Sequence, residues 1–142
     1  SGDRLRQWMG IDKTTFYDPR RVAIVPMGFC YPGKGTSGDL PPRPECAPTW
    51  HPRLLPRLKS VGVTLLVGHY AIRHRLGNRA ARSMTATCRQ WREHLADGIF
   101  VLPHPSPRNV GWFRRNPWFD DEVLPRLKSE VADALTVTRA AQ

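Results

Sequence analysis

The sequence predicts an α/β fold, a three-layer α/β/α domain built around a central parallel sheet. Three apolar runs, at 21–28, 63–70 and 99–105, are continuous rather than alternating, which is typical of strands buried on both faces. Segments with helical spacing lie between these runs, and strand–helix–strand order favours parallel strands joined by right-handed crossovers. We expect one domain over residues 1–142, because this length suffices for a sizeable core.

Helices are expected at the start of the chain and in three later segments. The segment 85–98 places Cys88 and Trp91 on one apolar face and ends at Gly98, a typical C-cap, so we expect Cys88 to lie in the core. Two further apolar stripes complete the pattern: Leu54, Leu55 and Leu58 in one helix, and Val123, Leu127, Val131, Ala134 and Leu135 in the helix predicted over 121–137.

The composition indicates a basic protein. Lys and Arg number 22 against 12 Asp and Glu, for a net charge of +10. Such a surplus favours a polyanionic partner, nucleic acid first, and simple solubility is the alternative. Three Cys argue against a closed disulfide framework and favour a reducing cytoplasm. No apolar run approaches the roughly 20 residues that span a membrane, so we expect no membrane association. We expect the protein to be a cytoplasmic monomer.

A long Pro- and Gly-rich segment, 30–50, is expected to be a loop. Loops of this length in compact domains are usually functional or disordered. Cys30 and Cys46 lie at either end of its Pro- and Gly-rich part, and from spacing alone they are either metal ligands or free thiols.

The stretch after the third apolar run carries the clearest chemical signal. Ligands of open α/β sheets bind at the carboxyl ends of the strands, and here that end is His104-Pro105-Ser106-Pro107-Arg108-Asn109. Prolines on both sides stiffen the backbone around His104. A preorganised imidazole can stabilise negative charge that develops on a leaving group, and a packed or solvent-facing histidine is the alternative.

The other histidines carry weaker signals. His69 follows the second run, in "VGHYA", and either faces the cleft or starts a helix. His51, His74 and His94 lie in polar or helical surroundings, and we expect them on the surface.

Two motifs together resemble the uracil-DNA glycosylase superfamily, closest to its iron–sulfur, family 4/5-like bacterial members. His104-Pro105-Ser106 is similar to the family's second motif, a turn after the last core strand. The other motif is the segment that starts at Cys30-Tyr31-Pro32-Gly33 and ends at Cys46. It is similar to the family's arrangement, in which a strand is followed by a Cys, then a Pro- and Gly-rich loop, and then a second Cys. The resemblance implies a uracil-DNA glycosylase-like α/β/α fold and a DNA repair hydrolase, which breaks the N-glycosidic bond of uracil or a related damaged base in DNA.

The resemblance also implies roles for residues of this turn. His104 would donate a hydrogen bond to uracil O2 as the base leaves, and Ser106 would bond a phosphate that is compressed as the base flips out. Arg108 and Asn109 would contact the DNA backbone or probe the gap left by the base. An ordinary polar loop is the alternative for Ser106, Arg108 and Asn109.

One departure from the family lies within the chain. The position matching the family's uracil-reading Asn is Pro26, so we expect Met27 and Gly28 to contact the base beside it. With Pro26 at this position, the target could be a damaged base other than uracil, or a different residue could recognise the base. Pro26 also favours the alternative of a non-catalytic nucleic-acid-binding module on the same fold. A small-molecule hydrolase with His104 as base is disfavoured, because no carboxylate lies beside His104 in the sequence.

The resemblance further implies a four-iron, four-sulfur cluster in the complete protein, with Cys30 and Cys46 as two of its four ligands. The family's other two ligands form a Cys-x-x-Cys pair, and its first motif is a Gly-x-x-Pro-Gly loop; residues 1–142 match neither. We therefore expect the domain to lack its N-terminal strand and first motif.

Overall fold

The computed structural model describes residues 1–140, and the side chains of residues 1–136. These residues form two compact units. The first unit comprises Ser1–Val22 and Val61–Gln142, and the second comprises Ala23–Ser60.

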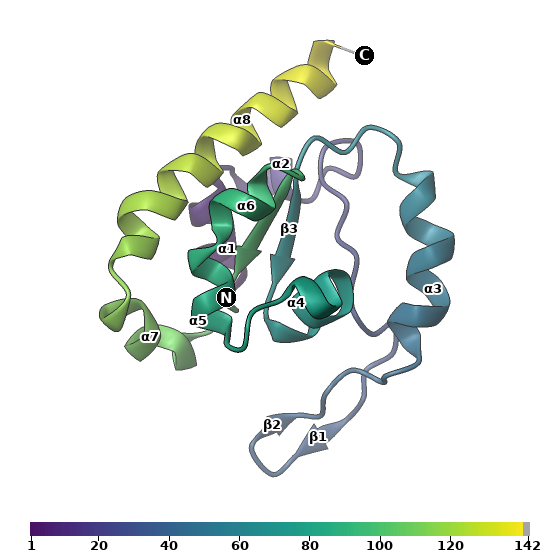
Figure 1. Cartoon of the computed structure of the whole chain (residues 1–142). Coiled ribbons are helices and arrows are strands. Elements are labelled where there is room, and N and C mark those ends of the chain that lie inside the picture. Colours follow the sequence, from purple (N-terminus) through teal and green to yellow (C-terminus); the bar gives the residue numbers. More distant parts are fainter. Residues whose placement is uncertain (141–142) are drawn as a thin grey trace. The chain divides into compact units, whose positions relative to one another are not determined.

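The first unit is built on two parallel strands, β3 (Thr64–Val67) and β4 (Ile99–Leu102), which pair from Thr64 beside Ile99 to Val67 beside Leu102. Helices precede, connect and follow these strands (Figure 1): α1 (Gly2–Met9), α2 (Lys13–Phe16), α4 (His69–Leu76), α5 (Met84–Arg89), α6 (Trp91–Leu95), α7 (Val110–Arg115) and α8 (Leu124–Ala140). Short 3₁₀ turns lie at Gly77–Arg79 and Pro107–Asn109, and a π-helical turn lies at Phe119–Val123.

The two strands are covered by helices on both faces. Phe100 and Leu102 of β4 pack in one hydrophobic cluster with residues of α1 and α8. Ile99 and Val101, which alternate with them along the strand, pack in a second cluster with residues of α4 and α5. All four β4 side chains are buried. The predicted α/β/α layering around a parallel sheet is therefore confirmed.

The predicted helices are present with shifted boundaries. The segment 85–98 forms two helices, α5 and α6, that meet at Gln90, and Gly98 takes a left-handed φ of 74° in the turn that leads into β4. Cys88 is fully buried in the core, as predicted. The apolar face of the last helix is also confirmed, because Val123, Leu127 and Val131 are at most 3% exposed. Within residues 1–140, no helix is long and apolar enough to cross a membrane.

The second unit holds more regular structure than the sequence predicts. A short antiparallel hairpin joins β1 (Lys34–Gly35) to β2 (Gly38–Asp39), and helix α3 (Cys46–Leu54) follows, ending in a 3₁₀ turn at Leu55–Arg57. The expectation of a loop throughout 30–50 was therefore wrong in part. The expected leucine stripe is also only partial, because Leu54 and Leu58 are half-buried and Leu55 is exposed.

The first predicted strand, 21–28, is not a strand in the structure. None of its residues is buried, and Ile24 is 58% exposed. A parallel strand needs a neighbouring strand to pair its backbone, and among the described residues only β3 and β4 pair in parallel. Pro26 also lacks the N–H that a central strand would donate. The apolar run therefore predicts a strand that has no partner here.

Two of the three histidines expected on the surface are buried. His51 is 7% exposed and His94 is 4% exposed, whereas His74 is exposed as predicted. Neither ring nitrogen of His94 has a hydrogen-bond partner among the described residues. For His51 the neighbours are Pro26 and Phe29, more than 20 positions away in the chain, which the local polar sequence does not indicate.

Candidate active site

His104 lies directly beyond the carboxyl end of β4, in the first unit. The prolines on both sides of it, Pro103 and Pro105, are buried, whereas His104 itself is exposed. Proline fixes φ near −65°, and burial holds both pyrrolidine rings in place. The imidazole therefore projects from a backbone that is anchored on both sides.

The residues after His104 brace this turn from within. Ser106 Oγ accepts the backbone N–H of Arg108 at 3.2 Å and so caps the 3₁₀ turn Pro107–Asn109. Asn109 Nδ2 donates to the carbonyl oxygen of His104 at 2.7 Å. Arg108 is exposed. The hydroxyl proton of Ser106 remains available to an external acceptor, while the amide of Asn109 fixes the backbone that carries His104.

The end of β3 lies against His104. The N–H of Gly68 donates to the carbonyl oxygen of Leu102 at 2.9 Å, which continues the pairing of the two strands. A Cβ at Gly68 would lie 3.6 Å from Cδ2 of His104. His69 and Tyr70 follow at once, both exposed, with ring centroids 3.9 Å apart. The glycine that lies against His104 therefore leads directly into an exposed aromatic pair.

The electrostatic state of His104 suits a neutral hydrogen-bond donor. Partial burial lowers the pKa of its imidazole below the usual 6.5. At pH 7 the ring is therefore neutral, with one nitrogen protonated and the other able to accept. A neutral imidazole N–H at the sheet edge can stabilise an oxyanion by donating a hydrogen bond to it.

We expect substitution of Gly68 by alanine to lower the free energy of unfolding by about 1–3 kcal/mol. Gly68 has φ 84° and ψ 164°, a conformation open almost only to glycine, at a site where the backbone is tied to Leu102. Relaxation of that strain would move the backbone beside His104, so the rate of base release from DNA should fall as well. Urea unfolding followed by circular dichroism measures the first effect.

Gly111→Ala is the matched control for this substitution. Gly111 lies within helix α7, and a Cβ there would meet only the end of the Arg115 side chain, at 3.2 Å. Alanine has the higher helix propensity, so we expect stability to be unchanged or slightly raised. Equal losses in the two variants would contradict the role given to the backbone of Gly68.

In the second unit, the expected base-contacting segment Pro26-Met27-Gly28 is held by its own neighbours. Nε2 of His51 lies 2.9 Å from the carbonyl oxygen of Pro26 and donates to it, because a carbonyl only accepts. A Cβ at Gly28 would lie 3.2 Å from Cβ of Pro42. As a proline, Pro26 has no backbone N–H, and its carbonyl oxygen already accepts a hydrogen bond from His51.

The cysteines differ sharply in environment. Cys30 is exposed, Cys46 is half-buried at the start of α3, and both are free thiols in the second unit. Burial raises the pKa of the Cys88 thiol to about 12, so Cys88 stays protonated in the core and does not suit metal ligation. No group of three or more His, Cys, Asp or Glu that could hold a metal occurs within residues 1–140. A four-iron cluster needs four ligands, so the described residues offer an incomplete set.

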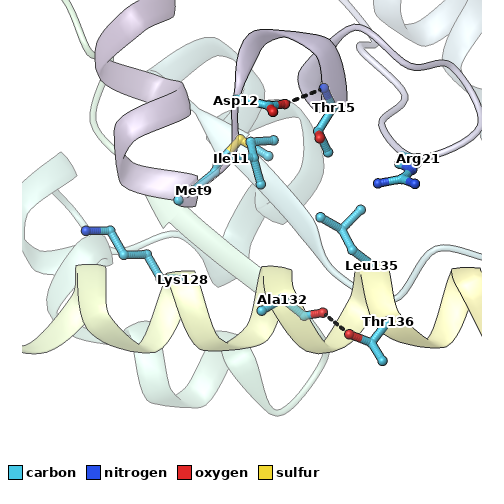
Figure 2. A pocket seen from close by; sticks show the side chains of 10 residues that line it. Met9, Ile11, Asp12, Thr15, Arg21, Lys128, Ala132, Leu135 and Thr136 are labelled. Atoms are coloured by element: carbon cyan, nitrogen blue, oxygen red, sulfur yellow. Dashed lines mark hydrogen bonds between the residues drawn. The ribbon is translucent and has the colours of Figure 1, made fainter.

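The pocket in Figure 2 lies between α1, α2 and the middle of α8 and has a volume of about 330 Å³, and His104 is not among its lining residues. Its polar groups are largely engaged within the protein. Asp12 accepts the N–H of Thr15 at 2.8 Å, Thr136 Oγ1 donates to the carbonyl of Ala132 at 2.9 Å, and Arg21 pairs with Asp18. None of the residues predicted to act on a substrate lines it.

The comparison with known families bears on the fold as a whole. Residues 1–128 match the family model of the Uracil DNA glycosylase superfamily. The chain belongs to this superfamily. Membership assigns it a uracil-DNA glycosylase-like function at the level of the superfamily, that of a hydrolase of DNA repair with DNA as substrate.

Sequence reasoning found the His104 turn but missed the contacts that position it. Asn109 was expected to touch DNA, and in the structure its amide bonds the backbone of His104. His51 was expected at the surface, and it is buried against Pro26. The Asn109 contact carries a readable signal, because an Asn five residues after a proline-bounded His can close the turn. The His51 contact joins residues 25 positions apart and leaves no local signal.

Proposed function

We propose that this protein removes uracil, or a related damaged base, from DNA by hydrolysing the N-glycosidic bond. Water supplies a hydroxyl to C1′ of the deoxyribose, the bond from C1′ to N1 of uracil breaks, and the base leaves with the bonding electron pair and is then protonated. His104 donates a hydrogen bond to O2 of the leaving uracil, where the negative charge gathers. The observation that carries this proposal is the exposed, neutral imidazole held between two buried prolines at the sheet edge.

The residues around His104 are proposed to prepare the substrate. Ser106 offers its hydroxyl proton to a phosphate while its oxygen caps the turn. Arg108 contacts the DNA backbone from the exposed side of the turn. Asn109 acts as a positioning residue, because its amide bonds the carbonyl of His104. Met27 and Gly28 are proposed to contact the base.

The experiment that tests this function is base release from a uracil-containing single-stranded oligonucleotide by the full-length protein. Strand cleavage at the resulting abasic sites after alkali treatment gives the amount of base released. A matched oligonucleotide with thymine in place of uracil is the control. Release of uracil but not thymine supports the proposal, and binding of both without release overturns it.

A second candidate function is a non-catalytic nucleic-acid-binding module. The observation that favours it is the state of Pro26, which has no N–H and whose carbonyl accepts from His51. Recognition of a base at this position would therefore depend on Met27 and Gly28 alone. DNA binding that weakens steeply with salt fits both functions, so turnover on uracil and on other damaged bases decides between them.

We also propose, from the resemblance to the iron–sulfur members, that Cys30 and Cys46 supply two ligands to a four-iron cluster in the full-length protein. The other two ligands would have to come from outside the described residues. When bound, such a cluster would brace the second unit and would take no part in breaking the glycosidic bond.

Iron and acid-labile sulfide measured on anaerobically purified full-length protein test this site. We expect about four iron atoms per chain, lost in both Cys30→Ser and Cys46→Ser. Cys88→Ala is the control and should keep its iron, because this thiol lies in the core. Protein that holds no iron or sulfide under these conditions would show that Cys30 and Cys46 are ordinary thiols.

A further inference from the structure

We propose that helix α4 forms a binding surface for the nucleotide that flanks the target base, with Tyr70 stacking on the flanking base and Arg73 holding its phosphate. This inference rests on the proposed function, because it makes His104 the centre of the site. It adds a stacking residue and a phosphate contact that explain which DNA the site prefers.

The first argument is position. Helix α4 starts immediately after β3, and β3 ends beside β4, since Gly68 bonds Leu102 and lies against the ring of His104. Tyr70 is two residues beyond Gly68, in the first turn of the helix. Figure 1 shows α4 beside the carboxyl end of β3. A nucleotide next to one held at His104 would therefore meet this first turn.

The second argument is the state of the Tyr70 ring. Tyr70 is 43% exposed, so much of its ring is open to a ligand. The His69 ring lies against it, with centroids 3.9 Å apart and planes inclined at 37°. Contact with a second ring restrains Tyr70 before any ligand arrives, which lowers the entropy lost on binding. Exposed aromatic rings of this kind are the usual stacking platforms for unpaired bases.

The third argument is charge. From His69 to Arg92 inclusive, the chain has six arginines and no Asp or Glu. Arg79 pairs with Asp97 and Arg92 with Glu122, but Arg73 and Arg75 are exposed and form no ion pair with another described residue. Arg73 follows Tyr70 by three residues and so shares its face of α4. An aromatic ring followed by an unpaired guanidinium matches a base followed by its phosphate.

A preference for single-stranded DNA follows from these contacts. In a duplex the flanking base is paired and stacked on both sides, so Tyr70 could reach its face only after that base is unstacked. In a single strand the face is free, and stacking on Tyr70 costs less. The surface therefore selects DNA whose bases next to the target are unpaired.

The test measures binding of the full-length protein to a short single strand whose uracil nucleotide carries a 2′-fluoro group that resists cleavage. One oligonucleotide has adenines beside the uracil, and a second has abasic spacers there. We expect Tyr70→Ala to weaken binding to the first about tenfold, a size typical of losing one stacked base, and to leave the second unchanged. Tyr70→Phe should bind both as the unmodified protein does.

Tyr17→Ala is the matched control, because Tyr17 is 57% exposed in the same unit and lies after α2, away from His104. It should bind both oligonucleotides normally. Arg73→Ala should weaken both equally and reduce the slope of log affinity against log salt by about one.

The outcomes separate this inference from the proposed function. If Tyr70→Ala loses no more affinity than Tyr17→Ala, or loses as much on abasic spacers as on adenines, the stacking surface is wrong even where uracil is released. If the protein shows the predicted dependence on adenine but releases no base from ordinary substrate, the surface stands and the glycosylase function fails.

Discussion

His104→Ala is expected to slow uracil release by about 100- to 1000-fold, the usual cost of removing one oxyanion donor. Affinity for uracil-containing DNA should change only a few-fold, because the donor acts mainly on charge that forms in the transition state. Single-turnover kinetics with enzyme in excess isolate this step from product release. Because His104 is exposed, its loss should leave the midpoint of unfolding unchanged.

His104→Gln provides the graded control, since a glutamine amide keeps a donor at the cost of reach and rigidity. We expect its rate to lie between those of the unmodified protein and His104→Ala. If His104→Ala released uracil as fast as the unmodified protein, or if the two variants had equal rates, His104 would not be the catalytic hydrogen-bond donor.

The pH dependence of the rate follows from the same residue. Because burial lowers the pKa of His104 below its usual 6.5, the neutral form of its ring predominates at pH 7 and above. Any inflection that His104 causes in the rate should therefore appear below pH 6.5. An inflection above pH 7 that disappears in His104→Ala would contradict this assignment.

Phe119→Ala is expected to lower the free energy of unfolding by about 3–5 kcal/mol, the usual loss for a fully buried phenylalanine. Phe119 has no exposed surface, and its ring packs edge-on against Trp8, with centroids 5.2 Å apart, and Trp112, at 5.6 Å. Its removal opens a cavity where α1 and α7 meet the start of α8. Total stabilities of about 5–15 kcal/mol are usual, so this one change would leave the fold marginal.

Phe29→Ala makes the same chemical change at a side chain that is 43% exposed, in the second unit. We expect it to cost less than about 1 kcal/mol. Urea unfolding of both variants, followed by circular dichroism, gives the comparison. Similar losses in the two would mean that the ring of Phe119 is not enclosed as described.

The strands and the long helix were predictable because their side chains carry the pattern themselves. Every residue of Ile99–Leu102 is apolar, and a strand that is apolar throughout can be stable only when both faces are covered. Val123, Leu127 and Val131 recur at helical spacing, so they mark the buried face of the last helix whatever it packs against. The His104 turn was equally visible, because proline restricts the backbone locally.

The run at 21–28 has the same composition as a strand and yet forms none. Strand formation depends on a neighbour that supplies hydrogen bonds, and the local sequence does not show whether such a neighbour is present. His51 and His94 were misplaced for a related reason, since burial of a polar side chain depends on what other elements bring to it. Pairing and burial are properties of the assembled chain.

The sequence by itself determined the layered α/β class, the burial of Cys88 and Trp91, the buried face of the last helix and the stiff turn that carries His104. These follow from apolar spacing and from proline geometry, which act over a few residues. Only the tertiary structure decided that Gly68 lies against His104, that Asn109 braces the His104 backbone and that His51 engages the carbonyl of Pro26. These contacts depend on the register of two parallel strands and on packing between distant segments, which local spacing does not encode.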